Sequence, residues 1–107
     1  MESVKFQKSS NSEGIVTQIS ISGFLTIENA QQLKKEFIAV IPNLNNQVEI
    51  VIHEVDDIDV SFVQLIVAFT RHLTDIGIKY NLQWNLDDEQ RLLFENVGLS
   101  FELSMNQ

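Results

Sequence analysis

The feature that most constrains the fold of this chain is a long amphipathic segment enclosed by two short apolar runs. From Phe62 to Ile76 apolar residues recur every three or four positions, which predicts a helix with one buried face, and Gly77 stands where such a helix commonly ends. Val48–Ile52 before it and Tyr80–Trp84 after it have the length and residue types of buried strands. Strand, helix and strand in this order predict two parallel strands joined by a right-handed crossover.

The residues before this unit predict a β-hairpin. Val4–Gln7 is a short predicted strand, and the polar run Ser9–Gly14 predicts the turn. Apolar and polar residues alternate in Ile15–Ser22, so we expect a half-buried strand there, ended by Gly23. Its buried face is predicted to consist of Ile15, Thr17, Ile19 and Ile21.

Between the hairpin and the central unit the sequence predicts another helix. Thr26 is expected to cap this helix through its side chain, and Pro42 is expected to end it. Val48–Ile52 is apolar apart from one Glu, which predicts an interior strand covered on both faces. The next residues, His53–Asp59, are mostly polar and are expected to form a loop.

The end of the chain predicts a third helix and a last strand. Asn85 is expected to cap the helix, with acidic residues at its positive end, and Gly98 to end it. Phe101–Leu103 would complete the order β-β-α-β-α-β-α-β, an α/β fold with a mixed sheet covered by helices. Because no repeat, low-complexity tract or Pro-rich linker interrupts this order, we interpret residues 1–107 as one domain.

The charge balance narrows the class of partner. Seven basic and fifteen acidic residues give a formal net charge of −8, so nucleic acid and anionic membrane surfaces are poor partners. The chain has no cysteine, which suits a reducing cytoplasm. No apolar stretch has the length of a membrane span or the character of a signal peptide. We therefore expect a cytoplasmic protein.

Four segments resemble a known family in order and spacing. They are Gly23–Ala30, the apolar strand Val48–Ile52, Ile58–Ser61 with the long helix after it, and Asn85–Leu99. Together they resemble the STAS domain, which sulfate transporters share with bacterial anti-sigma factor antagonists, over about Ile15 to Leu103. The resemblance implies a regulatory binding protein of a partner-switching circuit, with no catalytic activity and no cofactor. Its implied partner is a kinase-type anti-sigma factor or a related regulator.

The same resemblance implies that Ser61 is a phosphorylation site. In the antagonists this loop has the sequence Asp-Ser-Ser-Gly or Asp-Ser-Thr-Gly, and the second hydroxyl residue accepts the phosphate. Asp59 and Ser61 match, whereas Val60 and Phe62 depart from the family and make the loop bulkier. A helix N-terminus also tolerates a phosphate. By resemblance, the partner kinase binds the ATP, phosphorylation weakens the complex, and a serine phosphatase restores it.

A simpler interpretation makes Ser61 or Asp59 an ordinary helix cap. Carboxylates crowd the segment in either case, and a phosphate added there would act on a field that is already negative. Eight carboxylates lie in or near the third predicted strand, the Ser61 loop and the start of the third predicted helix, and they are Glu49, Glu54, Asp56, Asp57, Asp59, Asp87, Asp88 and Glu89.

The resemblance also implies a docking surface for the partner, at the start of the long helix and in the loop after the second strand. The implied residues are Phe24, Asp59, Val60, Ser61, Phe62, Val63 and Val67. Val63 and Val67 lie to the side of the core stripe, so this helix would be apolar beyond what its own sheet needs. The alternative is that neighbouring helices bury both valines.

Two other functions stay open. The chain could be a STAS subunit that docks constitutively on a transport or signalling complex without phosphorylation. Alternatively, Asp57 and Asp59 imitate the Asp-x-Asp opening of magnesium-dependent phosphatases. A polar interval separates Asp57 from the apolar strand, and the chain is short for that fold, so the phosphatase is the minor alternative.

Other catalytic arrangements have less support. His72 follows Ser61 by eleven positions on one helix, about 16 Å away, which is outside hydrogen-bond reach. His53 lies near Glu54, Asp56 and Asp57, but the four residues have no recognised metal-ligand spacing. We therefore predict no metal site.

Overall fold

The structure is a computed structural model, and it describes residues 3–96. Four strands form one sheet in the order β1-β2-β3-β4. They are β1 (Val4–Ser10), β2 (Val16–Leu25), β3 (Leu44–Ile58) and β4 (Lys79–Trp84). The helices are α1 (Ile27–Val40), α2 (Val60–Asp75) and α3 (Asp88–Asn96), with a 3-10 turn at Ile41–Asn43 after α1.

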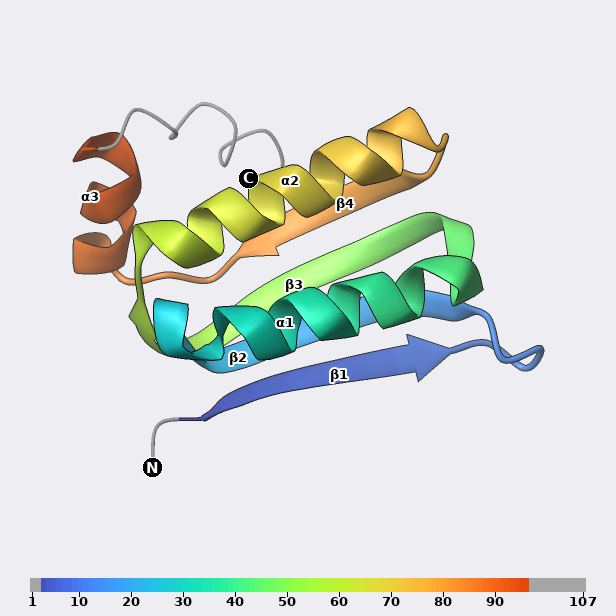
Figure 1. Ribbon diagram of the computed structural model, residues 1–107, viewed down its shortest axis with the longest axis horizontal. Helices are drawn as coiled ribbons and strands as arrows, with labels where there is room; N and C mark the ends of the chain where they lie inside the picture. The colour runs from blue at the N-terminus through green and yellow to red at the C-terminus, as the bar shows by residue number, and fades with distance from the viewer. Residues whose placement is uncertain (1–2, 97–107) are drawn as a thin grey trace.

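The sheet is mixed, as the sequence predicts. β1 pairs with β2 in antiparallel orientation, and β2, β3 and β4 are parallel. α1 and α2 lie side by side over one face of the sheet (Figure 1). Both helices connect neighbouring strands in the same direction across the sheet, so right-handed crossovers bring them to the same face. The predicted strand at Phe101–Leu103 and the helix end at Gly98 lie outside the described residues.

The core lies between the sheet and these two helices. Phe37 of α1 stacks on Phe69 of α2 with ring centroids 4.2 Å apart, and both side chains are buried. Burying an apolar side chain of this size contributes about 1.5–3 kcal/mol. The largest fully buried side chains are Phe62, Ile19, Ile21, Leu25, Leu33, Ile50, Ile52, Ile66, Leu73, Val40, Val48 and Val63. None of the helices in residues 3–96 is long and apolar enough to cross a membrane.

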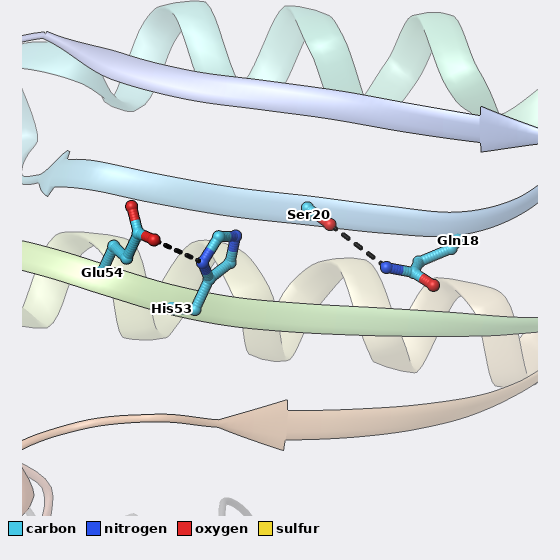
Figure 2. Close-up of polar contacts among 4 residues, drawn as sticks. All are labelled: Gln18, Ser20, His53 and Glu54. Carbon is cyan, nitrogen blue, oxygen red and sulfur yellow. Dashed lines mark hydrogen bonds and ion pairs between the residues drawn. The ribbon is translucent and has the colours of Figure 1, made fainter.

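The opposite face of the sheet carries polar side chains. Figure 2 shows Gln18 and Ser20 of β2 and His53 of β3 on the side of the strands away from the helices. Gln18 Nε2 donates to Ser20 Oγ at 3.3 Å. Glu49 is exposed and Val51 is half-buried. The prediction that Val48–Ile52 is covered on both faces is therefore wrong, because the described helices cover one face only.

Irregular pairing changes β2 from the predicted strand. The register shifts between Val16 and Gln18, which brings Val16 into the core at 4% exposure and leaves Ile15 and Thr17 half-buried. The strand does not end at Gly23 but continues to Leu25. Gly23 has φ +98°, and a Cβ there would lie 2.5 Å from the carbonyl oxygen of Ser3. Glycine is thus required where β2 passes the start of β1.

β3 is much longer than predicted, and this difference positions the site. Instead of a loop at His53–Asp59, the strand continues to Ile58, which pairs with Leu25 of β2. Glu54 has φ +47°, and the pairing shifts nearby, as expected at a bulge. Hydrogen bonding to β2 holds this polar segment extended. The ends of β2 and β3 therefore coincide.

The cap of α3 also differs from the prediction. Asn85 continues the sheet, since its N–H donates to the carbonyl oxygen of Ile52 at 2.8 Å. The helix is capped two residues later by Asp87, whose Oδ1 accepts from the N–H of Gln90 at 2.8 Å. Gln90 Oε1 accepts from the N–H of Asp87 in return, which completes a capping box. Gln90 Nε2 also donates to the carbonyl oxygen of Val55, which ties α3 to β3.

Candidate functional site

The candidate site lies where α1 and α2 begin. Because β2 and β3 are neighbouring parallel strands with coincident ends, the helices that follow them start side by side (Figure 1). The backbone N–H of Asp59 donates to the carbonyl oxygen of Leu25 at 3.1 Å, which joins the two strand-to-helix turns. The segments 24–27 and 59–61, 32 or more positions apart in the chain, thus form one surface.

Asp59 caps both helices with one carboxylate. Its Oδ1 accepts from the backbone N–H of Phe62 in the first turn of α2, at 3.3 Å. Its Oδ2 accepts from the backbone N–H of Ile27, the first residue of α1, at 2.9 Å. The sequence predicts an ordinary cap for its own helix here, and the structure adds a second, nonlocal one.

Thr26 has the backbone position of the α1 cap but not its chemistry. Its φ and ψ are extended, as predicted for a cap, yet its side chain makes no capping hydrogen bond. The Oγ1 atom is buried and has no hydrogen-bond partner within residues 3–96. The neighbouring turn is held by Asn29 instead, whose Nδ2 donates to the carbonyl oxygen of Phe24 at 2.8 Å. The cap predicted at Thr26 is therefore supplied by Asp59.

Ser61 is the second residue of α2 and is half-buried. It lies at the edge of a hollow of about 390 Å³ between α1 and α2. The other lining residues are Ile27, Ala30, Gln31, Lys34, Gln64 and Leu65. All of the described lining residues are neutral except Lys34, although the chain is acidic overall.

A second hollow of about 260 Å³ continues the first along the helices. The two hollows share Lys34 and Leu65, so a shallow apolar groove runs from Ser61 toward His72. Ile27 is 67% exposed at one end of the groove, and Ile38 is 59% exposed at the other. Ile27 is not among the residues predicted from the sequence. An apolar residue directly after a helix cap was the available signal.

The predicted docking residues divide into two groups. The side chains of Phe62 and Val63 are fully buried, and the Phe62 ring makes an edge contact with Trp84 at 6.0 Å between centroids. A partner has no access to either side chain, so the alternative of burial holds for Val63. The remaining predicted residues are half-buried and reach the surface. They are Phe24, Asp59, Val60, Ser61 and Val67.

The acidic residues that precede Ser61 in the chain differ in exposure and in hydrogen bonding. Asp56 and Asp57 are exposed at the end of β3, and Asp57 Oδ1 accepts from the N–H of Ile58 at 2.9 Å. Both oxygens of Asp59 are engaged by backbone N–H groups. Within residues 3–96, no three His, Asp or Glu side chains are grouped so that they could hold a metal ion.

The histidines lie apart from Ser61. His53 is on the face of the sheet away from the helices, where its Nδ1 lies 3.9 Å from Glu54 Oε1 (Figure 2). His72 is exposed near the far end of α2. The geometry thus gives Ser61 no histidine as a general base among the described residues.

Comparison with known proteins gives matches in structure. No protein-family model and no curated protein matches the chain. An anti-sigma factor antagonist from Mycobacterium paratuberculosis superimposes with a TM-score of 0.74 and 16% identity, over 95% of this chain and 84% of that one. SpoIIAA, an anti-sigma factor antagonist, matches in its unphosphorylated form with a TM-score of 0.64 and 20% identity, over 90% of this chain and 83% of its own.

The phosphorylated form of SpoIIAA, described as a Bacillus cell fate determinant, also matches. The TM-score is 0.59 at 20% identity, over 89% of this chain and 85% of that one. The STAS-like α/β fold predicted from the sequence is therefore confirmed, and the chain has the fold of these anti-sigma factor antagonists.

Proposed function

We propose that this protein is a cytoplasmic, non-enzymatic regulator that binds a kinase-type anti-sigma factor, or a related regulator, and is released when Ser61 is phosphorylated. The observation that carries the proposal is the position of Ser61, which is accessible in the first turn of α2 beside an open apolar hollow. Support also comes from the fold, since SpoIIAA has the same fold and is known in unphosphorylated and phosphorylated forms.

The proposed switch is a phosphoryl transfer. The γ-phosphoryl group of ATP, bound by the partner, moves to Ser61 Oγ, the hydroxyl proton is lost, and ADP leaves. The new group carries about −1.5 to −2 charges, and it is close in the chain to the carboxylates of Asp56, Asp57 and Asp59. This charge and bulk would weaken the complex. Hydrolysis of the phosphoester by a serine phosphatase would restore binding.

The contact surface we propose consists of Phe24, Ile27, Val60, Ser61 and Val67. These residues come from both strand-to-helix turns and from α2, and their side chains reach the surface. Phe62 and Val63 support this surface from the core. Phe62 stands where the antagonists have Gly. Because its side chain is buried, it does not add bulk to the outside of the loop.

A phosphorylation assay tests the proposal. We would incubate the protein with the kinase-like ATPase encoded nearest to it and with ATP, and then locate phosphate by mass spectrometry. The expected result is one phosphate on Ser61, absent from Ser61→Ala. Ser20→Ala is a matched control, because Ser20 is also half-buried but lies on the uncovered face of the sheet (Figure 2).

A binding measurement and a hydrolysis assay separate the alternative functions. Binding to the ATPase without phosphorylation, unchanged by Ser61→Ala, would contradict the switch and favour a constitutive scaffold subunit. Hydrolysis of a generic phosphoester in the presence of magnesium, lost in Asp57→Asn, would instead support the minor phosphatase alternative.

A further inference from the structure

Asp59 has a geometry that the switch described above does not use. We propose that Asp59 is a positioning residue that couples Ser61 to α1, so that a phosphate on Ser61 weakens the hydrogen bond between Asp59 and Ile27. The biological role of this coupling rests on the proposed phosphorylation of Ser61. Phosphorylation would then change the shape of the contact surface at Phe24–Ile27 in addition to its charge.

The first step is that only a carboxylate satisfies both helices. Oδ1 faces the N–H of Phe62 and Oδ2 faces the N–H of Ile27, so both side-chain oxygens act as acceptors. An Asn side chain has one acceptor oxygen and one donor NH₂ group, which would face one of the two N–H donors. Asp59→Asn therefore keeps the shape of the side chain but can cap one helix only.

The second step concerns the N–H of Ile27. The first four N–H groups of a helix have no acceptor within that helix, and Ile27 is the first residue of α1. Its acceptor is Asp59 Oδ2, 32 positions away in the chain. Thr26, the local cap residue, makes no capping hydrogen bond through its side chain. Hydrogen exchange at the Ile27 amide thus reports the bond to Asp59.

The third step places the phosphate beside this bond. Ser61 and Ile27 line the same hollow, and Ser61 lies in the same helical turn as the Phe62 N–H that Asp59 caps. A phosphate on Ser61 would repel the Asp59 carboxylate and compete for the N–H groups at the two helix starts. Since one carboxylate serves both helices, a displacement at α2 changes the bond to α1.

The experiment measures amide exchange with water by NMR in protein that carries phosphoserine at position 61, introduced during translation with an expanded genetic code. We expect the Ile27 amide to exchange about tenfold faster than in the unmodified protein, while the amide of Leu33 inside α1 is unchanged. Added negative charge alone slows base-catalysed exchange. Faster exchange would therefore identify a weakened hydrogen bond, not a field effect.

Variants separate coupling from a merely structural role. Asp59→Ala, which has no side-chain acceptor for either helix, should accelerate Ile27 exchange without the phosphate, and phosphoserine in that variant should cause no further acceleration. Asp56→Ala is the matched control, because it removes the same charge from an exposed residue at the end of β3, and in this variant phosphoserine should still accelerate exchange. If Asp59→Ala does not fold, the comparison of unmodified, phosphoserine and Ser61→Ala proteins decides the question.

The outcomes distinguish this proposal from the proposed function. Unchanged or slower Ile27 exchange in the phosphoserine protein would overturn the coupling, even where the kinase modifies Ser61. Equal acceleration by phosphoserine with and without Asp59 would also overturn it. Faster exchange that requires Asp59 supports the coupling, whereas failure of every tested kinase to modify Ser61 would count against the proposed function alone.

Discussion

Replacing Asp59 by Ala should destabilise the protein about twice as much as losing an ordinary helix cap. Substitution of a capping residue by Ala costs typically ~1 kcal/mol, within a range of about 0.5–2. Asp59 caps α2 at 3.3 Å and α1 at 2.9 Å, so the expected cost is about 2 kcal/mol.

Asp87 provides the matched control. It caps only α3, accepting from the N–H of Gln90 at 2.8 Å, and its side chain is exposed. Asp87→Ala should therefore cost about 1 kcal/mol, while removing the same charge. Both free energies of unfolding can be measured by urea denaturation, with unchanged m-values showing that the denatured states are comparable.

The comparison refutes the reasoning if Asp59→Ala is no more destabilising than Asp87→Ala. That result would mean that one of the two hydrogen bonds contributes nothing to folding, and the coupling inferred above would lose its basis. Asp59→Asn should fall between Ala and the natural residue, at about 1 kcal/mol, because it retains one cap.

Three further predictions concern the backbone and the contact surface. Gly23→Ala should lower the free energy of unfolding by about 2–3 kcal/mol, because φ is positive and the new Cβ meets backbone, whereas Gly77→Ala has open space and should cost about 1 kcal/mol by thermal denaturation. Ser61→Asp should weaken binding to the partner ATPase more than Ser61→Ala in a titration; equal effects would make Ser61 only part of a cap. Ile27→Asp should reduce that binding with little change in stability, and Ile76→Asp, at an exposed site at the other end of α2, should leave it unchanged.

The elements that could be predicted from the sequence are those in which a periodic set of side chains is buried on one face. In α2, most of the apolar residues at helical spacing are buried, although Leu65 is half-buried and Ile76 is 47% exposed. Gly77 follows the helix with a positive φ. β4 also agrees with the prediction, and the predicted hairpin is present, although β1 continues to Ser10 and shortens the turn predicted at Ser9–Gly14. In these segments the burial of one face produces the periodic pattern of apolar residues, so the pattern predicts the element.

The extension of β3 could not be predicted in this way. His53–Asp57 alternates poorly and contains three carboxylates, so its composition indicates a loop. Its conformation is set instead by hydrogen bonds to β2 and by the bulge at Glu54, which has φ +47°. Because backbone pairing depends on a neighbouring strand and not on side-chain identity, a pattern within the segment does not reveal it.

The sequence predicts the local hydrogen bond of Asp59 but not the nonlocal one, because the second depends on the pairing of two strands. An Asp directly before the first turn of a helix predicts a local cap, and Asp59 accepts the N–H of Phe62 in this way. Its bond to Ile27 joins residues 32 positions apart and exists because two parallel strands end together. Local capping rules predict that Thr26 caps α1, but its side chain makes no capping hydrogen bond.

Val60 and Phe62 stand where the antagonists have a hydroxyl residue and Gly, and the structure places their two side chains in different surroundings. Both residues flank Ser61, and from the sequence both enlarge the loop in the same way. In the structure, Phe62 is fully buried against Trp84, so this substitution fills the core, whereas Val60 is half-buried at the surface. Of the two, only Val60 reaches the surface beside Ser61. Under the proposed phosphorylation of Ser61, the difference that bears on recognition by a kinase is therefore the absence of a hydroxyl at position 60, whereas Phe62 contributes to the packing of the core.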